Sequence, residues 1–259
     1  MISARINAER LVLLGWSRAI LLQLAHPLVA AGVDEHSTFR AGTLASALRL
    51  HQTVRAMLSL TFGTDAERQA TLGHINAIHR RVNGQLREAV GPFPAGTAYT
   101  AEDPSLLLWV HATLLESIPL VYEMVVAPVG ADERDRYCRE AEPIVVALGA
   151  RVGAPRSWSE LTAYMDRMHA SGELVVSPQA RKLADAVLAP PLGWMLGPAA
   201  RINWLFTVGL LPAVIREQYG FTWTARDAHA LERWTQIIRR TRRLAPRRVA
   251  MWREAAAYS

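Results

Sequence analysis

Residues 103–126 of this chain read Asp-Pro-Ser-Leu-Leu-Leu-Trp-Val-His-Ala-Thr-Leu-Leu-Glu-Ser-Ile-Pro-Leu-Val-Tyr-Glu-Met-Val-Val. Asp103 followed by Pro104 combines an acidic N-cap with a proline at the first helical position, which marks the start of a helix. The run that follows is apolar almost throughout and predicts a long helix to about Val126. Pro119 lies inside this run and predicts a kink.

The rest of the chain shows the same helical spacing. Apolar residues recur three and four positions apart, and no long alternation of apolar and polar residues suggests a strand. The pattern therefore predicts an all-α protein, a single globular domain over residues 1–259 with about eight to ten helices. The other helices are expected at 8–25, from Pro27 to about Glu35, at 43–61, 65–88, 131–149 with a bend or split at Pro143, 158–171, 178–189, 198–219 with an interruption at Pro212, and 225–244 with a short continuation after Pro246.

Composition bounds the class of protein. The chain has 259 residues, of which 51% are hydrophobic and 20% charged, so it can bury a large core and is not a disordered protein. Cys138 is its one cysteine. A single cysteine excludes an internal disulfide framework, a cysteine-based zinc site and c-type haem attachment.

The formal charge of +6 is concentrated near the C-terminus. Eight arginines fall within residues 232–259 beside only two acids, Glu232 and Glu254, and the rest of the chain has equal numbers of basic and acidic residues. The basic patch therefore belongs to an Arg-rich C-terminal helix at 225–255. Its default interpretation is a solvated helix face rather than a nucleic-acid or anionic-membrane contact, and no nucleic-acid partner is expected.

Two apolar stretches invite a transmembrane interpretation, and both are interrupted. Residues 11–33 contain Arg18, Gln23, His26 and Pro27, which would be costly in lipid. The stretch 204–215 is too short to span a bilayer and contains Pro212. With no clean signal peptide either, we expect a soluble, cytoplasmic protein without a transmembrane segment.

Several common catalytic motifs are missing. No histidine has a glutamate three positions before it, so the paired ligands of a ferritin-like di-iron site are absent. Neither H-E-x-x-H, a Gly-rich phosphate loop nor G-x-S-x-G occurs. These absences disfavour zinc-dependent hydrolysis, nucleotide chemistry and serine hydrolysis.

Histidines within apolar helical segments are what remains. Each of His26, His79 and His111 lies among apolar neighbours at helical spacing, and any one alone is most simply a hydrogen-bonded core residue. Three in one all-α chain favour a pocket for b-type haem with an imidazole as axial ligand. Arg18 lies two turns before His26 and is a candidate partner for a haem propionate, or else an ion-paired arginine.

Four segments together resemble the family of rubber oxygenases and the mycophenolic-acid-pathway oxygenase. They are Arg18-Ala-Ile-Leu-Leu-Gln-Leu-Ala-His-Pro-Leu-Val-Ala-Ala-Gly-Val-Asp-Glu-His-Ser, His79-Arg-Arg-Val-Asn-Gly, Tyr99-Thr-Ala-Glu-Asp-Pro and Leu108-Trp-Val-His-Ala-Thr-Leu. The resemblance covers most of the chain. It implies an all-helical fold, and its latex-clearing members bind haem b and cleave carbon–carbon double bonds of polyisoprene with dioxygen.

The resemblance also ranks the candidate residues. Arg49-Leu-His-Gln-Thr53 is similar to the Arg-x-x-Lys-Thr segment near the distal haem face of the latex-clearing enzymes, which implies distal roles for Arg49 and Thr53. It makes His79, on the helix that follows, the preferred iron ligand and His111 the second candidate. Gln52 replaces the family's lysine, and an amide cannot serve as its acid or base. A smaller lipophilic molecule is therefore expected in place of polyisoprene.

The leading hypothesis is a haem-b-dependent oxygenase that uses O2 on an apolar, alkene-containing, isoprenoid-like small molecule. Two alternatives stay open at this stage. One is a haem protein that binds a small ligand or carries electrons without turnover. The other is a haem-free helical interaction protein whose working surface is the Arg-rich C-terminal helix. An oligomer is compatible with all three.

Overall fold

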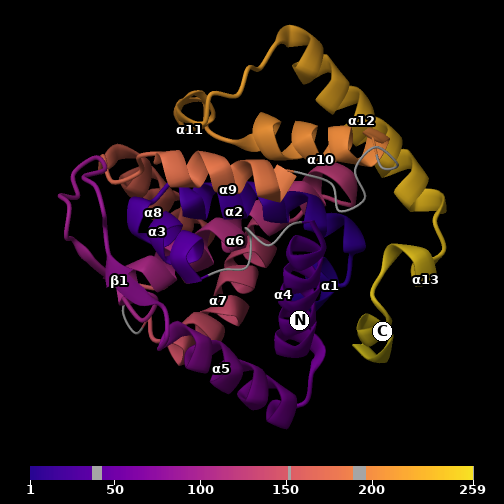
Figure 1. Ribbon diagram of the computed structural model, residues 1–259. Helices are drawn as coiled ribbons and strands as arrows, with labels where there is room; N and C mark the ends of the chain where they lie inside the picture. The colour runs from indigo at the N-terminus through magenta and orange to yellow at the C-terminus, as the bar shows by residue number, and fades with distance from the viewer. Residues whose placement is uncertain (37–42, 151–152, 189–196, 259) are drawn as a thin grey trace.

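The apolar helix expected from residue 104 is present as α6, Pro104–Val125, and the other helices surround it (Figure 1). The computed structural model describes residues 1–36, 43–150, 153–188 and 197–258; for 43–50 and 257–258 only the backbone is described. Nearly all elements are helical, which confirms the all-α prediction.

The described part of the chain holds more helices than expected, because several are short. The helices are α1 (Ile2–Asn7), α2 (Trp16–Leu24), α3 (Pro27–His36), α4 (Thr43–Phe62), α5 (Asp65–His79), α6, α7 (Ala131–Leu148), α8 (Trp158–Ala170), α9 (Pro178–Leu188), α10 (Gly197–Leu210), α11 (Ala213–Gln218), α12 (Ala225–Leu244) and α13 (Arg247–Ala250), with 3-10 segments η1 (Arg10–Gly15) and η4 (Arg253–Tyr258) and strands β1 (Asn83–Gln85) and β2 (Ala98–Thr100).

The start of α6 follows from its first residues. The Asp103 carboxylate accepts hydrogen bonds from the backbone N–H groups of Ser105 (2.8 Å) and Leu106 (3.4 Å), which are otherwise unpaired at a helix start. The helix then continues without a break through Pro119. The start of α6 is therefore fixed by its cap, and the rest of the helix is held by burial along its length.

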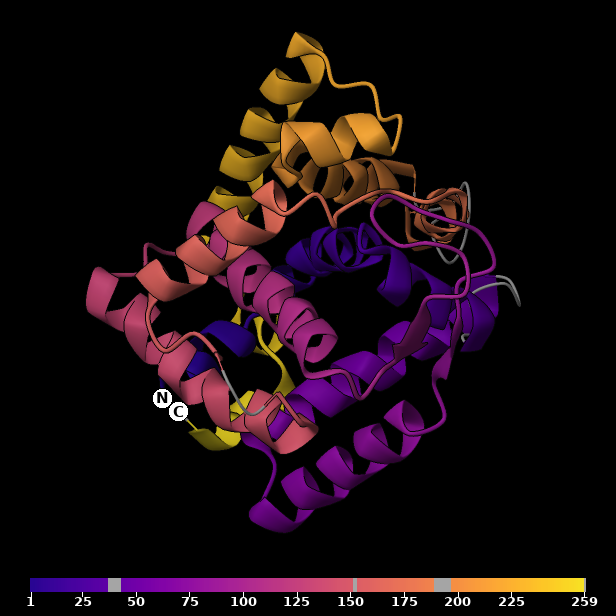
Figure 2. The same ribbon diagram turned by 90° about the vertical axis from the view of Figure 1, so that its left-hand side faces the viewer.

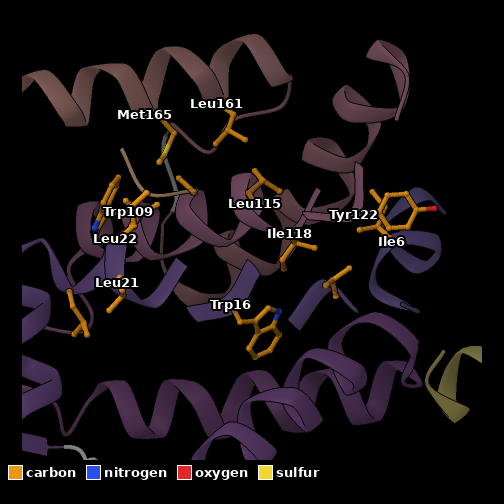
Figure 3. Close-up of a cluster of buried hydrophobic side chains, with 14 of the residues drawn as sticks. Ile6, Trp16, Leu21, Leu22, Trp109, Leu115, Ile118, Tyr122, Leu161 and Met165 are labelled. Atoms are coloured by element: carbon orange, nitrogen blue, oxygen red, sulfur yellow. The ribbon is translucent and has the colours of Figure 1, made fainter. Parts of the chain in front are cut away.

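Most of α6 is buried by its neighbours. Trp109 is fully buried between α2 and α8, and Figure 3 shows it among Leu22, Leu161 and Met165. Farther along the helix, Tyr122 lies beside Ile6 of α1 (Figure 3). Each large apolar side chain removed from water in this way contributes about 1.5–3 kcal/mol before conformational entropy is subtracted. The core of the protein is therefore built around α6.

Two boundary predictions are wrong. The single helix expected at 8–25 is divided into η1 and α2, preceded by α1. The helix expected at 65–88 ends at His79, and residues 83–85 instead pair antiparallel with 98–100, with Gly84 opposite Tyr99. A Cβ at Gly84 would lie 2.5 Å from Tyr99 Oη, so this pairing requires glycine. The α7 helix, in contrast, is continuous at Pro143 rather than split.

The C-terminal segment returns to the start of the chain, and both views place the two ends close together (Figures 1 and 2). Trp252 donates its backbone N–H to the carbonyl of Ala8 (3.0 Å), and Met251 forms a β-bridge with Glu9. The Arg242 guanidinium also binds both carboxylate oxygens of Glu9. These contacts hold the C-terminal segment against the N-terminal segment.

By length and composition, α6 could cross a membrane, as could the bent pair Arg10–Leu24 and Pro27–His36 if it were one span. From the sequence, only 11–33 and 204–215 suggested a membrane span, and 104–125 did not. In the structure, 67% of the most apolar stretch of α6 is buried inside the protein, and the bent pair turns by 106°. Burial by protein is the ordinary reason for a core helix to be this apolar.

A matched pair of glycine substitutions tests the packing around α6. A Cβ at Gly15 would lie 2.6 Å from the backbone oxygen of Ser117, so Gly15→Ala must push η1 away from α6 and should cost about 1–3 kcal/mol of unfolding free energy. Gly73, within α5, has open space around it, so Gly73→Ala should stabilise by about 0.5–1 kcal/mol. Urea unfolding measures both; equal effects of the two variants would contradict the packing described here.

Candidate cofactor and substrate pocket

A pocket of about 260 Å³ lies between α3, α5, α6 and the β-hairpin. Its described lining carries no Asp, Glu, Lys or Arg, and it is mostly aliphatic. Such a cavity favours an uncharged, lipophilic occupant. The lining residues are Gln23, Leu28, Val29, Gly32, Val33, His36, Ile78, His79, Val82, Tyr99, Thr100, Ala101, Leu106, Leu107 and Val110.

His79, the last residue of α5, is the sequence-predicted iron ligand that lines this pocket. A capping box formed by Thr64 and Glu67 fixes the start of α5. The helix ends with His79 at the pocket wall. The Nδ1 atom of His79 is buried and has no hydrogen-bond partner in the structure. Burial lowers the pKa of His79, and the Glu102 carboxylate opposes that shift. The imidazole is therefore held neutral, which is the form that binds metals.

The second candidate, His111, lies on α6 beside the pocket residues Leu107 and Val110. Its own side chain is not among the described lining. Its Nε2 atom is buried and likewise has no hydrogen-bond partner. Burial lowers the pKa of His111 to about 4, so this ring also stays neutral at physiological pH. Two of the three histidines selected from the sequence thus carry a buried nitrogen without a partner.

Tyr99 and Glu35 form a polar pair at the pocket that the sequence analysis missed. The Tyr99 hydroxyl donates a short hydrogen bond to Glu35 Oε2, and Arg87 Nε donates to Glu35 Oε1 (3.0 Å). The hydrogen bond from Tyr99 is the main reason that the pKa of Glu35 is lowered, while burial and the carboxylate raise the pKa of Tyr99. Tyr99 occurs in a family-like segment, but its partner 64 residues away could not be identified from spacing.

His26 has a structural position away from the pocket. Its Nδ1 accepts a hydrogen bond from the backbone N–H of Leu28 (3.3 Å), in the first turn of α3, and its ring packs against Phe93 at a centroid distance of 5.3 Å. Its Nε2 lies 3.8 Å from a carboxylate oxygen of Glu173. Burial lowers the pKa of His26 to about 4, and the Asp103 carboxylate opposes the shift. His26 is not among the described lining residues.

Arg18 is also directed away from the pocket, into the contact between α2 and α6. It is 4% exposed, and each of its three nitrogens has a protein partner. Nε donates to the carbonyl of Leu210 (2.8 Å), Nη1 donates to Ser117 Oγ (2.6 Å), and Nη2 pairs with Glu116 Oε2 (2.8 Å). Three of the five N–H groups of Arg18 are therefore bound within the protein, and its contact with a haem propionate stays a prediction.

The residues predicted for the distal face lie on α4. The side chain of Arg49 lies outside the described part of the structure, and Thr53 is exposed. No described residue of α4 lines the pocket. The distal roles of Arg49 and Thr53 stay predictions.

A metal ion at this pocket would need ligands beyond protein side chains. Across the described residues, no three His, Cys, Asp or Glu side chains come close enough to share a metal ion. Cys138 of α7 is buried in the protein core. Burial raises the pKa of its thiol to about 12, which disfavours a thiolate ligand. One imidazole can hold iron when a porphyrin supplies the other ligands.

The pocket, which includes His79 and has no Asp, Glu, Lys or Arg in its described lining, lies within an all-α protein. Residues 4–240 match the family described as "ER-bound oxygenase mpaB/B'/Rubber oxygenase, catalytic domain", and this chain belongs to that family. The resemblance stated from the sequence motifs is thereby confirmed.

Two curated relatives match most of the length of this chain, and both are described as uncharacterized. Uncharacterized proteins of Mycobacterium bovis and Mycobacterium tuberculosis are each 25% identical to this chain over 232 residues, which is 88% of this chain and 88% of each relative. No solved structure matches the chain. Membership of the oxygenase family therefore rests on the family match over residues 4–240.

Replacing Arg18 separates a structural role from a cofactor role. Arg18→Met removes three interactions and leaves the partly buried Glu116 without its partner, so unfolding should become easier by about 2 kcal/mol. Haem affinity of the folded protein should not change. Denaturant unfolding and haem titration measure the two effects, and lost haem affinity with unchanged stability would instead support a propionate contact.

Acid should destabilise the protein through its buried histidines. His111 has a folded-state pKa near 4, below that of the unfolded chain, so between about pH 6.5 and pH 4 the unfolded state binds a proton that the native state does not. Stability is therefore lost as the pH falls through this range, by on the order of 1–3 kcal/mol for this group. His111→Leu should flatten the pH dependence of the urea midpoint. An unchanged slope would show that His111 titrates normally in the native state.

Proposed function

We propose that this protein is a haem-b-dependent oxygenase that uses O2 to oxidise an apolar, alkene-containing small molecule. The observation that carries the proposal is His79: a neutral imidazole with a buried nitrogen lacking any partner, in the wall of an apolar pocket, within an oxygenase-family chain. A buried polar atom without a partner costs about 1–3 kcal/mol, and an axial bond to iron would remove that cost.

The chemistry of the pocket fits haem. Aliphatic side chains from α3 and α6 suit the faces of a porphyrin, and Gly32 leaves room, because a Cβ there would come within 3.3 Å of Val82. The volume of about 260 Å³ is close to the lower limit of ordinary ligand sites, about 300–1,000 Å³. We therefore expect α3, α5 and α6 to separate when haem enters, with a measurable rise in thermal stability once it is bound.

Different residues of the chain would hold the haem, exclude water and contact the substrate. Haem, when bound, would supply the iron at which O2 is activated. His79 would hold the iron, while Leu28, Val29 and Leu106 exclude water and contact an uncharged substrate. Tyr99 keeps its proton because its pKa is raised, and its hydroxyl remains directed at Glu35 Oε2. Arg49 and Thr53 are proposed for the distal face on the family resemblance alone.

The absence of charge favours the substrate class. No Asp, Glu, Lys or Arg is among the described lining residues, so the walls offer no permanent charge to a carboxylate, phosphate or ammonium group, whereas aliphatic walls gain free energy from burying hydrocarbon. An isoprenoid-like alkene fits these walls.

The second candidate function is a haem protein without turnover, and one observation favours it. Since His111 Nε2 is also buried and unpartnered, a second imidazole is available near the pocket. If both imidazoles bound the same iron, no position would remain for O2, and electron transfer would be the function that the site supports.

The experiment is an absorption spectrum of the protein expressed with adequate haem, recorded after reduction and again under CO. A Soret band that shifts with CO indicates an open iron position and supports the oxygenase; an unshifted band supports the bis-histidine protein. His79→Ala should abolish the band, and the matched variant His111→Ala should keep it. The reverse pattern would reassign the ligand to His111. No Soret band in the parent protein would contradict both haem functions and leave a haem-free interaction protein.

A further inference from the structure

The C-terminal helices expose a continuous row of arginines. On α12, the outward positions at helical spacing are occupied by Arg226, Arg233, Arg240 and Arg243, while the opposite face packs on α10 and α6. Beyond the end of α12, Arg247 and Arg248 of α13 and Arg253 of η4 are exposed as well, and Figure 1 shows α13 following α12 on the right. We call the seven exposed arginines of this region the arginine surface: Arg226, Arg233, Arg240, Arg243, Arg247, Arg248 and Arg253.

Little negative charge balances this surface. Glu232 and Glu254 are the only exposed carboxylates between residues 225 and 256. Asp227 is buried and bound by Arg201, and the acid nearest the end of α12, Glu9, is already occupied by the inward-facing Arg242. None of the seven arginines forms an ion pair with a described carboxylate. Their positive charge is therefore available to a partner.

The arginine surface also exposes aliphatic side chains. Leu244 is 85% exposed and Val249 is 62% exposed, and they lie on either side of the break between α12 and α13. Ile237 is exposed on the same face of α12. Leu244 is the most exposed large hydrophobic residue in the described structure. Aliphatic side chains exposed on a cationic face are in contact with water, and a partner that covers them makes a favourable hydrophobic contribution to binding.

A second pocket, of about 520 Å³, opens beside this point. Arg247, Arg248 and Arg253 contribute to its described walls, together with the apolar Met251 and Trp252. Arg10 adds a further guanidinium, 5.1 Å from the centre of the Trp252 ring. Guanidinium groups next to an apolar wall suit an anionic group that is attached to hydrocarbon.

The geometry points to a peripheral membrane-binding surface: the arginine surface contacts the anionic headgroups of a lipid bilayer, and Leu244 and Val249 insert between them. Charge complementarity identifies the partner, because an anionic bilayer offers both negative charge and a hydrocarbon layer beneath it. Nucleic acid offers only the charge. The one Phe, Tyr or Trp on α12 and α13, Trp234, is partly buried, and two exposed aliphatic residues gain nothing from a phosphodiester backbone.

Vesicle sedimentation with the full-length protein tests this surface. The protein should sediment with phosphatidylcholine vesicles that contain phosphatidylserine, not with pure phosphatidylcholine, and added salt should release it. Arg247→Gln/Arg248→Gln should weaken binding about 25-fold, or about fivefold for each charge. The matched control Arg136→Gln/Arg139→Gln removes two exposed arginines from α7 and should change binding less than about twofold.

Insertion is tested with an environment-sensitive fluorophore. Leu244→Cys labelled with NBD should shift its emission to the blue on binding phosphatidylserine vesicles, whereas labelled Val146→Cys, exposed on α7, should not. Cys138 is buried and leaves the added thiol as the labelling site. Leu244→Ser/Val249→Ser should weaken vesicle binding and keep its salt dependence.

Several results of these experiments would contradict a membrane-binding role for the arginine surface. No sedimentation with anionic vesicles, equal losses in the two arginine pairs, or an unshifted Leu244 label on sedimented protein would each overturn the proposal. Binding to a short DNA duplex without binding to vesicles would assign the surface to nucleic acid instead. The measurements do not involve the haem pocket, so their outcome is independent of the proposed oxygenase activity.

Discussion

Most residues of α6 are apolar and buried, so the surrounding segments must keep water away from this helix, and this constraint shapes the whole molecule. Segments η1, α2, α7, α8 and α12 all pack against α6, and its buried polar groups must be paired from those neighbours. Gln23 donates to Thr113 (3.0 Å) and Arg18 donates to Ser117, so α2 is fixed to α6 by hydrogen bonds as well as by burial. His111, the histidine on α6, has no such partner for its buried Nε2.

Local sequence signals predicted the helices well and the loops poorly. Asp103 and Thr64 both cap helices as their sequence context indicates, because a cap involves neighbours within one turn. Residues 83–85 were misassigned, since their pairing partners lie some 15 positions downstream. The local apolar pattern selected His26, His79 and His111 alike, and only the family resemblance ranked His79 first. Arg18 and His26, which helical spacing placed on one cavity, are separated by the 106° turn between α2 and α3.

Charge is segregated in this protein. The pocket beside α3 and the β-hairpin has no charged residue in its described lining, whereas α12 and α13 carry the arginine surface. Figure 1 shows α3 and β1 on the left and α12 and α13 on the right. A surface that attracts anions therefore lies away from a cavity suited to neutral hydrocarbon. The two can bind their partners without competing, and substitutions in one need not disturb the other.

The contact between Glu9 and Arg242 also constrains the order of folding. These residues are 233 positions apart, and the Ala8–Trp252 hydrogen bond spans a still longer stretch. During synthesis, the buried carboxylate of Glu9 cannot find its partner until residue 242 has been made. Pairing over such a separation is slow and leaves the segment around Glu9 without these contacts until then. This segment is thus the part of the nascent chain where we expect a chaperone to bind.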